Sequence, residues 1–138
     1  HRTGDLGAID ARGRLHLSGR AADVMKSGGY RIHPGEIETV LDGTAGGRAV
    51  CVVGLPSDYW GEVIVAIAED PPPAWPEDAV TRVAALARHK HPRAWLALPE
   101  LPRNAQGKVV RARVREAILA THALEDGPRP RLVALKPQ

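Results

Sequence analysis

Short apolar runs, broken by glycine and proline, recur through much of the sequence. Residues 49–53 and 61–68 are rich in valine, isoleucine and alanine and carry a single charge between them. Runs of this kind, bounded by turn residues, are typical of buried strands. A third run, residues 95–98, has the same character. The pattern therefore predicts a small three-stranded sheet.

Apolar residues recur at helical spacing in three other segments, residues 34–42, 76–91 and 109–120. In the first of these, Pro34 suits the first helical turn and Ile37 begins an apolar face. The third segment is basic as well as amphipathic. Together with the strands, these helices predict an α+β fold in which two or three helices pack on the small sheet.

Two β-hairpins are expected before this core. Residues 7–17 alternate around a turn that contains glycine, and residues 19–32 continue as a second hairpin with its tip at 27–29. Glycine lets a backbone turn tightly or approach a ligand closely, and Lys26 and Arg31 beside the tip are ready partners for phosphate. The same pattern also fits an ordinary hairpin, so both interpretations stay open at this point.

The last residues have a different composition. From His122 onward, Pro128, Pro130 and Pro137 interrupt the chain. Proline at this density argues against a further helix, and we expect residues 122–138 to form an extended tail that is open to disorder.

Composition narrows the classes of function. The 138 residues, 43% hydrophobic and 25% charged, suit one soluble globular domain. No apolar run is long enough to span a bilayer, so we expect no membrane span. The single cysteine, Cys51, cannot form an internal disulfide and permits a reducing, cytoplasmic location. The chain begins at His1 without an initiator methionine, and we expect it to be part of a longer protein.

Charge and aromatic content argue against a nucleic-acid partner. The net charge is +3, phenylalanine is absent and aromatic residues make up 4% of the chain. Base-stacking platforms need more aromatic side chains than this, set among clustered cations. The histidines lack metal-ligand spacing, so no metal site is expected. No pairing of a nucleophile with a base stands out either.

Two polar positions are candidates for chemistry. Lys108 follows Gly107 at the end of a polar loop, and such a lysine can be delivered to a phosphate or carboxylate on another surface. It can equally be a solvated lysine before a basic helix. The spacing is not that of a P-loop, because Val109 follows the lysine. Asp5, on a predicted turn, can accept the paired hydroxyls of a ribose or simply cap the turn.

Three blocks of sequence resemble the adenylate-forming (ANL) superfamily. They are RTGDL at residues 2–6, the stretch from Gly-Arg to PGEIE at residues 19–38, and LPRN followed by GK at residues 101–108. Their order and spacing are similar to those of acyl-CoA synthetases, peptide-synthetase adenylation domains and luciferase. The resemblance spans roughly residues 2–115, which correspond to the end of the large domain and to the small C-terminal domain.

The resemblance implies the C-terminal part of an ATP-dependent acyl-CoA synthetase, an acid–thiol ligase. In such enzymes a carboxylate and ATP form an acyl-adenylate, the small domain rotates, and a thiol takes the acyl group. The implied cofactors and partners are ATP with Mg²⁺, CoA as a substrate, a small carboxylic acid and a large N-terminal AMP-binding domain. That domain would hold most of the nucleotide, and we expect the isolated fragment to be inactive.

The implied domain division has three parts. Residues 1–20 would be the end of the large AMP-binding domain with its hinge, and residues 21–121 the C-terminal lid domain. Residues 122–138 would be a Pro-rich tail. The family's hinge position, commonly aspartate or lysine, is Ala22 here. We hypothesise that this alanine lowers the preference for one orientation of the lid.

Site residues are carried over position by position. Lys108 matches the catalytic lysine that bridges the carboxylate and the α-phosphate during adenylation. The nucleotide-binding residues that the resemblance implies are Asp5, Arg20 and Arg31. Residues that match the loop lining the tunnel for the CoA thiol are Lys26, Ser27, Gly28 and Gly29.

Two alternatives to the acyl-CoA synthetase remain. The chain could be the C-terminal subdomain of a peptide-synthetase-type adenylation domain that loads a carrier protein. It could also be a stand-alone binding or regulatory module. The sequences at residues 26–32 and 101–104 are more similar to acyl-CoA synthetases, including the malonyl-CoA and medium-chain types, than to peptide-synthetase domains.

Overall fold

The structure is a computed structural model that describes residues 23–46 and 48–135 of the chain. The hairpin expected at residues 7–17 lies outside the described residues. In chain order the elements are β1 (Met25–Ser27), β2 (Tyr30–Ile32), α1 (Pro34–Leu41), β3 (Val50–Ser57), β4 (Gly61–Glu69), α2 (Trp75–Val83), a short 3₁₀ helix (Arg88–Lys90), β5 (Ala94–Leu98), α3 (Arg111–Thr121), β6 (His122–Glu125) and β7 (Arg131–Ala134).

Strand β4 is the centre of a sheet that has five strands within the described part of the chain. It pairs antiparallel with β3 from Gly61 to Ala68 and parallel with β5 from Val65 to Glu69. At its first residue, Gly61, it pairs with Ser57 of β3 on one side and Ser27 of β1 on the other. Strand β2 extends the sheet beyond β1. The β1–β2 hairpin and β5 therefore share one edge of β4.

The side chains of β4 alternate between two cores. Val63, Val65 and Ile67 pack with Val114 and other residues on the side of α3, whereas Ile64 and its neighbours two residues apart pack toward α1 and α2. Because the sheet is covered on both faces, its central strands carry apolar residues almost continuously. That is why the sequence shows unbroken apolar runs here.

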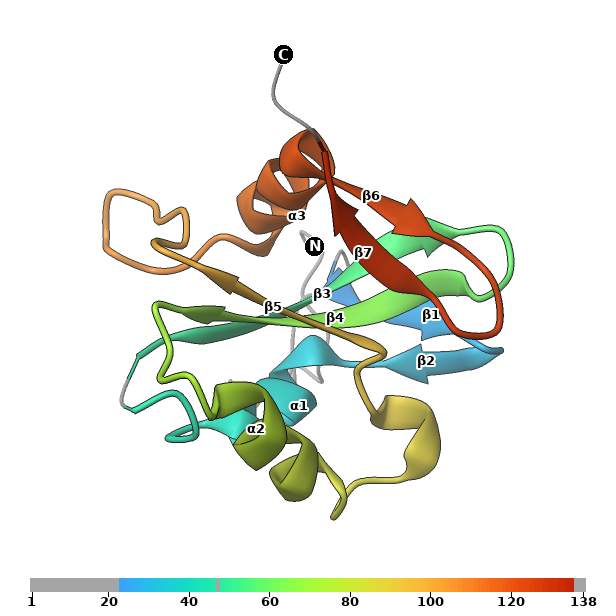
Figure 1. Cartoon of the computed structure of the whole chain (residues 1–138), viewed down its shortest axis with the longest axis horizontal. Coiled ribbons are helices and arrows are strands. Elements are labelled where there is room, and N and C mark those ends of the chain that lie inside the picture. The colour runs from blue at the N-terminus through green and yellow to red at the C-terminus, as the bar shows by residue number, and fades with distance from the viewer. Residues whose placement is uncertain (1–22, 47, 136–138) are drawn as a thin grey trace, which may run out of the picture.

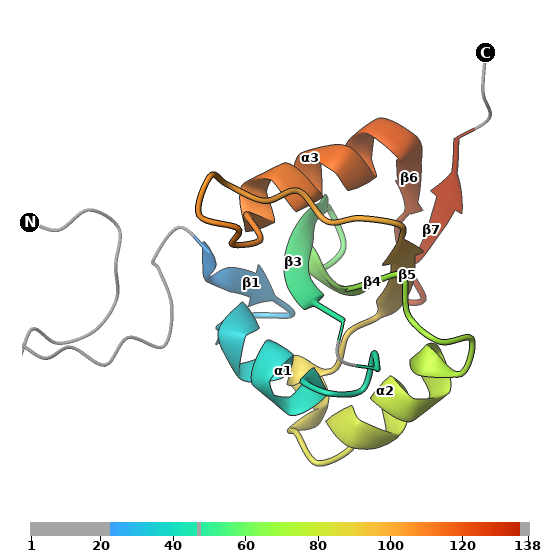
Figure 2. The ribbon, with the colours of Figure 1, turned by 90° about the vertical axis from the view of Figure 1, so that its left-hand side faces the viewer.

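The molecule thus has three layers. Helices α1 and α2 lie against one face of the sheet, and α3 with the β6–β7 hairpin lies against the other (Figures 1 and 2). Cys51 of β3 faces the α3 side and is a core residue, with 1% exposure. Burial, more than the nearby charge of Glu38, raises the pKa of its thiol to about 12.

The α+β class is confirmed, and the three strands expected from the apolar runs are present as β3, β4 and β5. The strand number of the sheet was wrong, because in the described residues the hairpin at 25–32 joins the sheet through β1 instead of preceding it. Nothing in the hairpin's own residues indicates this pairing. It depends on Gly61, which lies far along the chain.

The helix boundaries differ from expectation in one place. The ends of helices α1 and α3 lie within two residues of the predicted ends. Helix α2 instead ends at Val83, before the predicted end at residue 91, and a 3₁₀ helix follows at Arg88–Lys90. Helix α3 begins at Arg111 because Val109 and Val110 are still extended, and Val109 bridges to Arg103.

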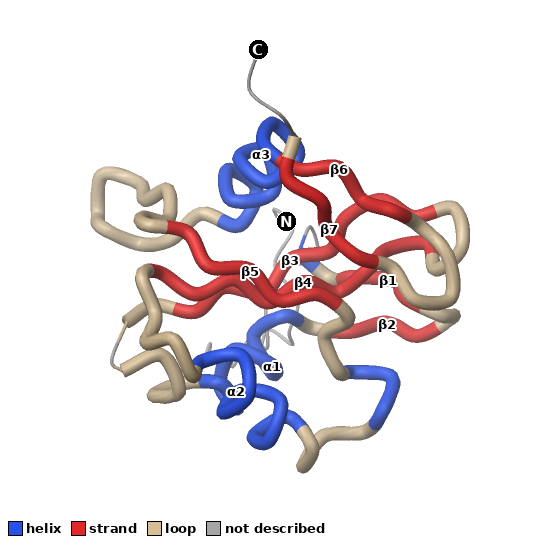
Figure 3. Tube along the Cα trace, viewed as in Figure 1, coloured by secondary structure: helices blue, strands red, loops and turns tan. Residues whose placement is uncertain are grey.

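The C-terminal segment is more ordered than its prolines predict. Residues 122–134 form an antiparallel hairpin, β6–β7, instead of a disordered tail (Figure 3). Leu124 and Leu132 face each other in this hairpin and pack against the α3-side core. Pro128 and Pro130 lie in the connecting turn, where proline does not interrupt a strand ladder.

Candidate functional site

The turn between β1 and β2 consists of two glycines with positive φ. Gly28 has φ +60° and Gly29 has φ +87°, the conformation of a type I′ hairpin turn. Residues with a Cβ rarely adopt this conformation. Lys26 and Arg31 lie opposite each other in the strand register and are both exposed. The hairpin thus presents a tight glycine turn with two cations beside it.

This turn is fixed to the start of β4. The backbone N–H of Gly28 donates to the carbonyl of Trp60 at 2.9 Å, and the N–H of Lys26 donates to Glu62 Oε1 at 2.8 Å. A Cβ at Gly61 would lie 2.9 Å from the carbonyl oxygen of Lys26. Glycine is therefore required at Gly61 for the two strands to approach, and the turn has a defined position.

Aromatic and cationic side chains surround the turn. The Arg93 guanidinium lies 3.7 Å from the centre of the Trp60 ring. The Tyr30 and His89 rings stack at 3.8 Å with 13° between their planes. Ring faces of this kind accept cations and flat ligands. The grouping brings three aromatic rings and one arginine together from four separate segments, and the sequence alone did not reveal it.

Lys108 lies on a different loop, which is held by Asn104. The Asn104 side-chain oxygen accepts hydrogen bonds from the N–H of Gln106 at 2.9 Å and of Lys108 at 3.0 Å. The backbone N–H of Asn104 donates to the carbonyl of Lys108, and Gly107 adopts φ +85°. The Asn104 side chain thus mimics a backbone turn. Its effect is to fix the main chain of an exposed lysine.

The base of this loop is fixed by an ion pair between Arg103 and the end of β4. Both terminal nitrogens of Arg103 donate to Glu69, at 2.6 and 2.9 Å, and the N–H of Leu101 donates to Glu69 Oε2 at 2.9 Å. The hydrogen bond from Arg103, followed by that from Leu101, lowers the pKa of Glu69 to about 2. The hydrogen bond with Glu69 in turn raises the pKa of Arg103. A bidentate pair of this kind sets both position and orientation.

The two candidate edges lie at opposite ends of the domain. In Figure 1 the β1–β2 turn is on the right, and the orange loop that carries Lys108 is on the left. The structure therefore brings Lys26, Gly28, Gly29 and Arg31 together but not with Lys108. Ser27 differs from its neighbours because it is buried, with 3% exposure, and does not project from the turn.

Arg111 connects the region near the predicted hinge to the Lys108 side. Its Nη1 pairs with Asp23 Oδ2 at 2.9 Å. Its Nε donates to Glu38 Oε2 at 3.0 Å, and its Nη2 pairs with Glu38 Oε1. Glu38 in turn accepts the N–H of Val52 at 2.8 Å. Burial lowers the pKa of Arg111, but the hydrogen bond and charge of Glu38, followed by the charge of Asp23, outweigh it and raise the pKa overall.

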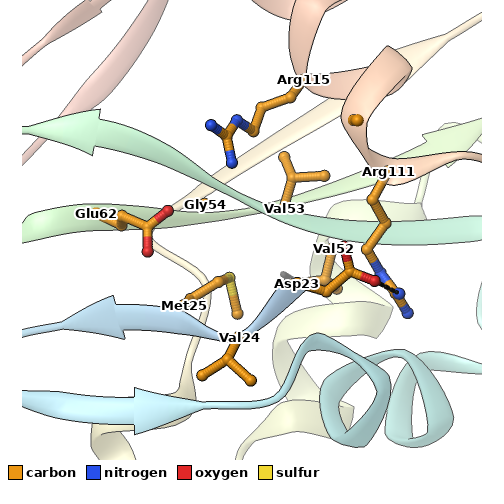
Figure 4. A pocket seen from close by; sticks show the side chains of 10 residues that line it. Asp23, Val24, Met25, Val52, Val53, Gly54, Glu62, Arg111 and Arg115 are labelled. Carbon is orange, nitrogen blue, oxygen red and sulfur yellow. Dashed lines mark hydrogen bonds and ion pairs between the residues drawn. The ribbon is translucent and has the colours of Figure 1, made fainter. Parts of the chain in front are cut away.

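Figure 4 shows Arg111 extending from α3 to Asp23, with Arg115 further along the same helix. These residues line a pocket of about 120 Å³ that Val24, Met25 and Glu62 close from the side of the sheet. The network holds the first described residues of the chain against helix α3. Asp23 is within the GR-to-PGEIE block, but its pairing with Arg111 could not be foreseen without the fold.

Three predicted positions cannot be placed. Asp5, Arg20 and Ala22 lie outside the described residues. Among residues 23–46 and 48–135, no group of three or more histidine, cysteine, aspartate or glutamate side chains could hold a metal ion. In the same residues, no helix is long and apolar enough to cross a membrane.

The fold is that of a known class of domain. The family model for the AMP-binding enzyme C-terminal domain matches residues 36–108, and the chain belongs to this family. The predicted resemblance to the adenylate-forming superfamily is confirmed.

Curated relatives and a solved structure give the same result. The chain is 38% identical over 122 residues to the long-chain-fatty-acid–CoA ligase FadD13 of Mycobacterium tuberculosis, covering 87% of this chain and 24% of the relative. It is 39% identical over 132 residues to a 4-chlorobenzoate–CoA ligase of Arthrobacter, covering 94% of this chain and 25% of that enzyme. The chain thus spans about a quarter of the length of these relatives.

Its fold matches the crystal structure of ATP-bound MatB from Rhodopseudomonas palustris. The TM-score is 0.72 at 33% sequence identity, with 83% of this chain and 24% of that chain covered.

Proposed function

We propose that this chain is the C-terminal part of an ATP-dependent acyl-CoA synthetase. In this proposal residues 21–121 form a lid on a large AMP-binding domain, residues 1–20 are the end of that domain with the hinge, and residues 122–138 follow the lid. Its relatives are CoA ligases, and the match to an ATP-bound structure supports ATP as the activating nucleotide. The proposed reaction joins a small carboxylic acid to CoA through an acyl-adenylate.

One observation carries this proposal: an exposed lysine on a loop lies at one end of the sheet and a glycine turn lies at the other. The two ends cannot face the same point of a partner at the same time (Figure 1). A lid that rotates between two half-reactions would present them in turn. A module that only bound one ligand would need one of these edges and not both.

In the adenylation step we assign the catalytic role to Lys108. Its ammonium would lie between the substrate carboxylate and the α-phosphate and lower the repulsion between two anions that must meet. The Asn104 turn and the Arg103–Glu69 pair hold the backbone of this lysine in place. Asp5 would hold the ribose hydroxyls, and Arg20 would contact the nucleotide near the hinge.

In the thioester step the Gly28–Gly29 turn would line the tunnel through which the CoA thiol reaches the acyl-adenylate. A turn without side chains leaves room for a thin, flexible arm to pass close to the backbone. Lys26 and Arg31 add positive charge, and the Trp60 and Tyr30 rings add flat surfaces, near its entrance. These groups suit the phosphates and the adenine of CoA.

The described residues contribute little to binding the metal. ATP brings Mg²⁺, which prefers carboxylate oxygens, water and phosphate oxygens. Since the described part of this lid offers no cluster of such ligands, the large domain and the phosphates would hold the ion. When bound, Mg²⁺ would neutralise phosphate charge, while Lys108 would act on the side of the carboxylate.

The test follows both half-reactions in this chain joined to the large domain. ATP–pyrophosphate exchange with a panel of carboxylic acids measures adenylation, and thioester formation is measured with CoA and with a carrier protein as competing acceptors. We expect exchange with some acids and transfer to CoA. Transfer to the carrier protein alone would replace the proposal with the peptide-synthetase type. Exchange by the isolated 138-residue chain would show that it is not merely a lid.

A further inference from the structure

We propose that Asp126, in the β6–β7 turn, is a positioning residue for the Gly28–Gly29 turn. It would act through Ser57 and Trp60, and its effect on the thioester step rests on the function proposed above. The inference assigns a role to the C-terminal hairpin, which lies beyond residues 36–108 that match the family model. Figure 1 shows the turns β1–β2, β3–β4 and β6–β7 together at one end of the molecule.

The first step of the argument is the number of donors that Asp126 accepts. Its Oδ1 accepts the hydroxyl of Ser57 at 2.6 Å, and its Oδ2 accepts the N–H of Asp58 at 2.7 Å and of Tyr59 at 3.1 Å. Its own turn adds the N–H of Gly127 at 2.9 Å. The hydrogen bond from Ser57, more than those from the backbone, lowers the pKa of Asp126. An ionised carboxylate thus holds the whole β3–β4 turn.

The second step is a continuous series of hydrogen bonds from this carboxylate to the glycine turn. The N–H of Trp60 donates to Ser57 Oγ at 2.8 Å, and the same hydroxyl donates to Asp126. The carbonyl of Trp60 accepts the N–H of Gly28 at 2.9 Å. Hydrogen bonds in a series polarise one another. The position of the carboxylate is therefore linked to the backbone of Trp60 and, through Trp60, to Gly28.

The third step is a second attachment of the same tryptophan. The indole N–H of Trp60 donates to the carbonyl of Gly127 at 2.7 Å, so the β6–β7 turn holds both the backbone and the ring of this residue. A Cβ on Gly28 would lie 3.5 Å from that ring, which shows how closely the ring backs the glycine turn. The Trp60 ring also carries Arg93 on its face.

The β6–β7 hairpin is itself well supported. Leu124 and Leu132 pack against the α3-side core, and the N–H of Leu135 donates to the carbonyl of Thr121 at 2.8 Å. Asp126 therefore lies in a turn whose two strands are packed against the core. The hairpin connects helix α3, which follows the Lys108 loop, to the glycine turn at the opposite end of the domain.

The experiment uses this chain joined to the large domain and compares Asp126→Asn and Ser57→Ala with the unaltered protein. Asparagine keeps the size of the side chain but loses the charge and one acceptor oxygen, whereas Ser57→Ala breaks the series and leaves the Asp126 carboxylate in place. The matched control is Glu125→Gln, which removes a carboxylate one residue away whose partner is the exposed Arg131 at 2.7 Å. Readouts are NMR signals of the Trp60 indole and the Gly28 and Gly29 amides, and the KM for CoA.

We expect both test variants to shift these three signals and to raise the KM for CoA roughly 5- to 10-fold, the loss of about one charge-assisted hydrogen bond. ATP–pyrophosphate exchange and the Glu125→Gln control should be unchanged. Signals that coincide with the unaltered protein would overturn the proposal.

A second outcome separates this inference from the proposed function. Shifted signals with an unchanged KM for CoA, in an enzyme that forms acyl-CoA, would overturn the effect on the thioester step and leave the proposed function standing. An unaltered enzyme that made no acyl-CoA would instead overturn the proposed function. The three NMR signals would still show whether Asp126 sets the glycine turn.

Discussion

The Lys108 loop and the Gly28–Gly29 turn are built in different ways. The loop is held mainly by its own residues, because Asn104 clasps the backbone of Lys108 and an ion pair to Glu69 fixes its base. The turn is closed by the pairing of Ser27 with Tyr30, and it is also held from the side by distant residues, Trp60 and Gly61 at the start of β4.

This difference suits the roles proposed above for the two edges, a lysine charge on one and the wall of a thiol tunnel on the other. A point charge needs a fixed backbone and a free side chain, and the local Asn104 turn supplies both. A narrow passage needs its walls fixed relative to one another, and in this proposal several turns would supply those walls. We therefore expect damage to the loop to stay local and damage around the turn to spread. The following predictions test that contrast, beginning with the largest effect.

Replacing Lys108 with alanine should lower adenylation by roughly 10²- to 10³-fold, because one charged group that stabilises the transition state is lost. Thioester formation from preformed acyl-adenylate should be nearly unaffected. ATP–pyrophosphate exchange and single-turnover transfer to CoA measure the two steps. The control is Lys90→Ala, a lysine paired with Glu36 at 2.7 Å. An equal loss in both steps would contradict the division of roles between the edges.

Replacing Arg111 with methionine should lower the free energy of unfolding by about 2–3 kcal/mol, because Glu38 and Asp23 lose their partner in a half-buried site. Urea denaturation measures this loss. The matched control is Arg113→Met on the exposed side of the same helix, where we expect little change. Because Arg111 lies between the edges, its loss should slow both half-reactions. Loss of one step alone would show that the domain does not act as one body.

Two glycines offer a reciprocal test of the contrast. Gly29 and Gly107 have nearly the same φ, +87° and +85°, and a Cβ on either would meet no atom within 4 Å. Alanine at each position should therefore introduce about 1–2 kcal/mol of backbone strain and no clash. Gly29→Ala should slow thioester formation roughly 10-fold, and Gly107→Ala should slow adenylation to a similar degree. Effects on the same step from both variants would contradict two separate edges.

The smallest effect concerns acid stability at the base of the loop. The pKa of Glu69 falls from an ordinary 4.5 to about 2 in the folded protein. Its contribution to stability is therefore present in full above pH 4.5 and is lost as the pH falls toward 2. Thermal unfolding between pH 5 and pH 2 should show less acid sensitivity in Glu69→Gln than in the unaltered chain. Equal sensitivity would mean that this carboxylate is not what holds the loop base.

Much of the fold followed from local patterns in the sequence. The runs at residues 49–53 and 61–68 predicted β3 and β4, because a strand covered on both faces must be apolar throughout. Pro34 marked the start of α1. The glycines at 28 and 29 predicted a hairpin turn, and their positive φ is what makes glycine necessary there. Each of these signals lies within the element that it predicts.

What the sequence could not provide was pairing between distant segments. The contact of Ser27 with Gly61, and the pair of Arg111 with Asp23, each join residues more than thirty positions apart. The β6–β7 hairpin was missed because Pro128 and Pro130 suggested an unstructured tail, whereas they occupy its turn. Asn104 and Gly107 did carry a local signal, an Asx turn, that could have predicted the clasp on Lys108.

The length of strand β4 also sets the distance between the two edges. The strand begins at Gly61, where the glycine turn is attached, and ends at Glu69, where the Lys108 loop is attached. An extended strand rises about 3.3 Å per residue, so its two ends are roughly 26 Å apart. The packed cores on both faces prevent this length from changing. If the proposed lid is correct, the number of residues in this one strand determines how far apart the edges used in the two half-reactions lie.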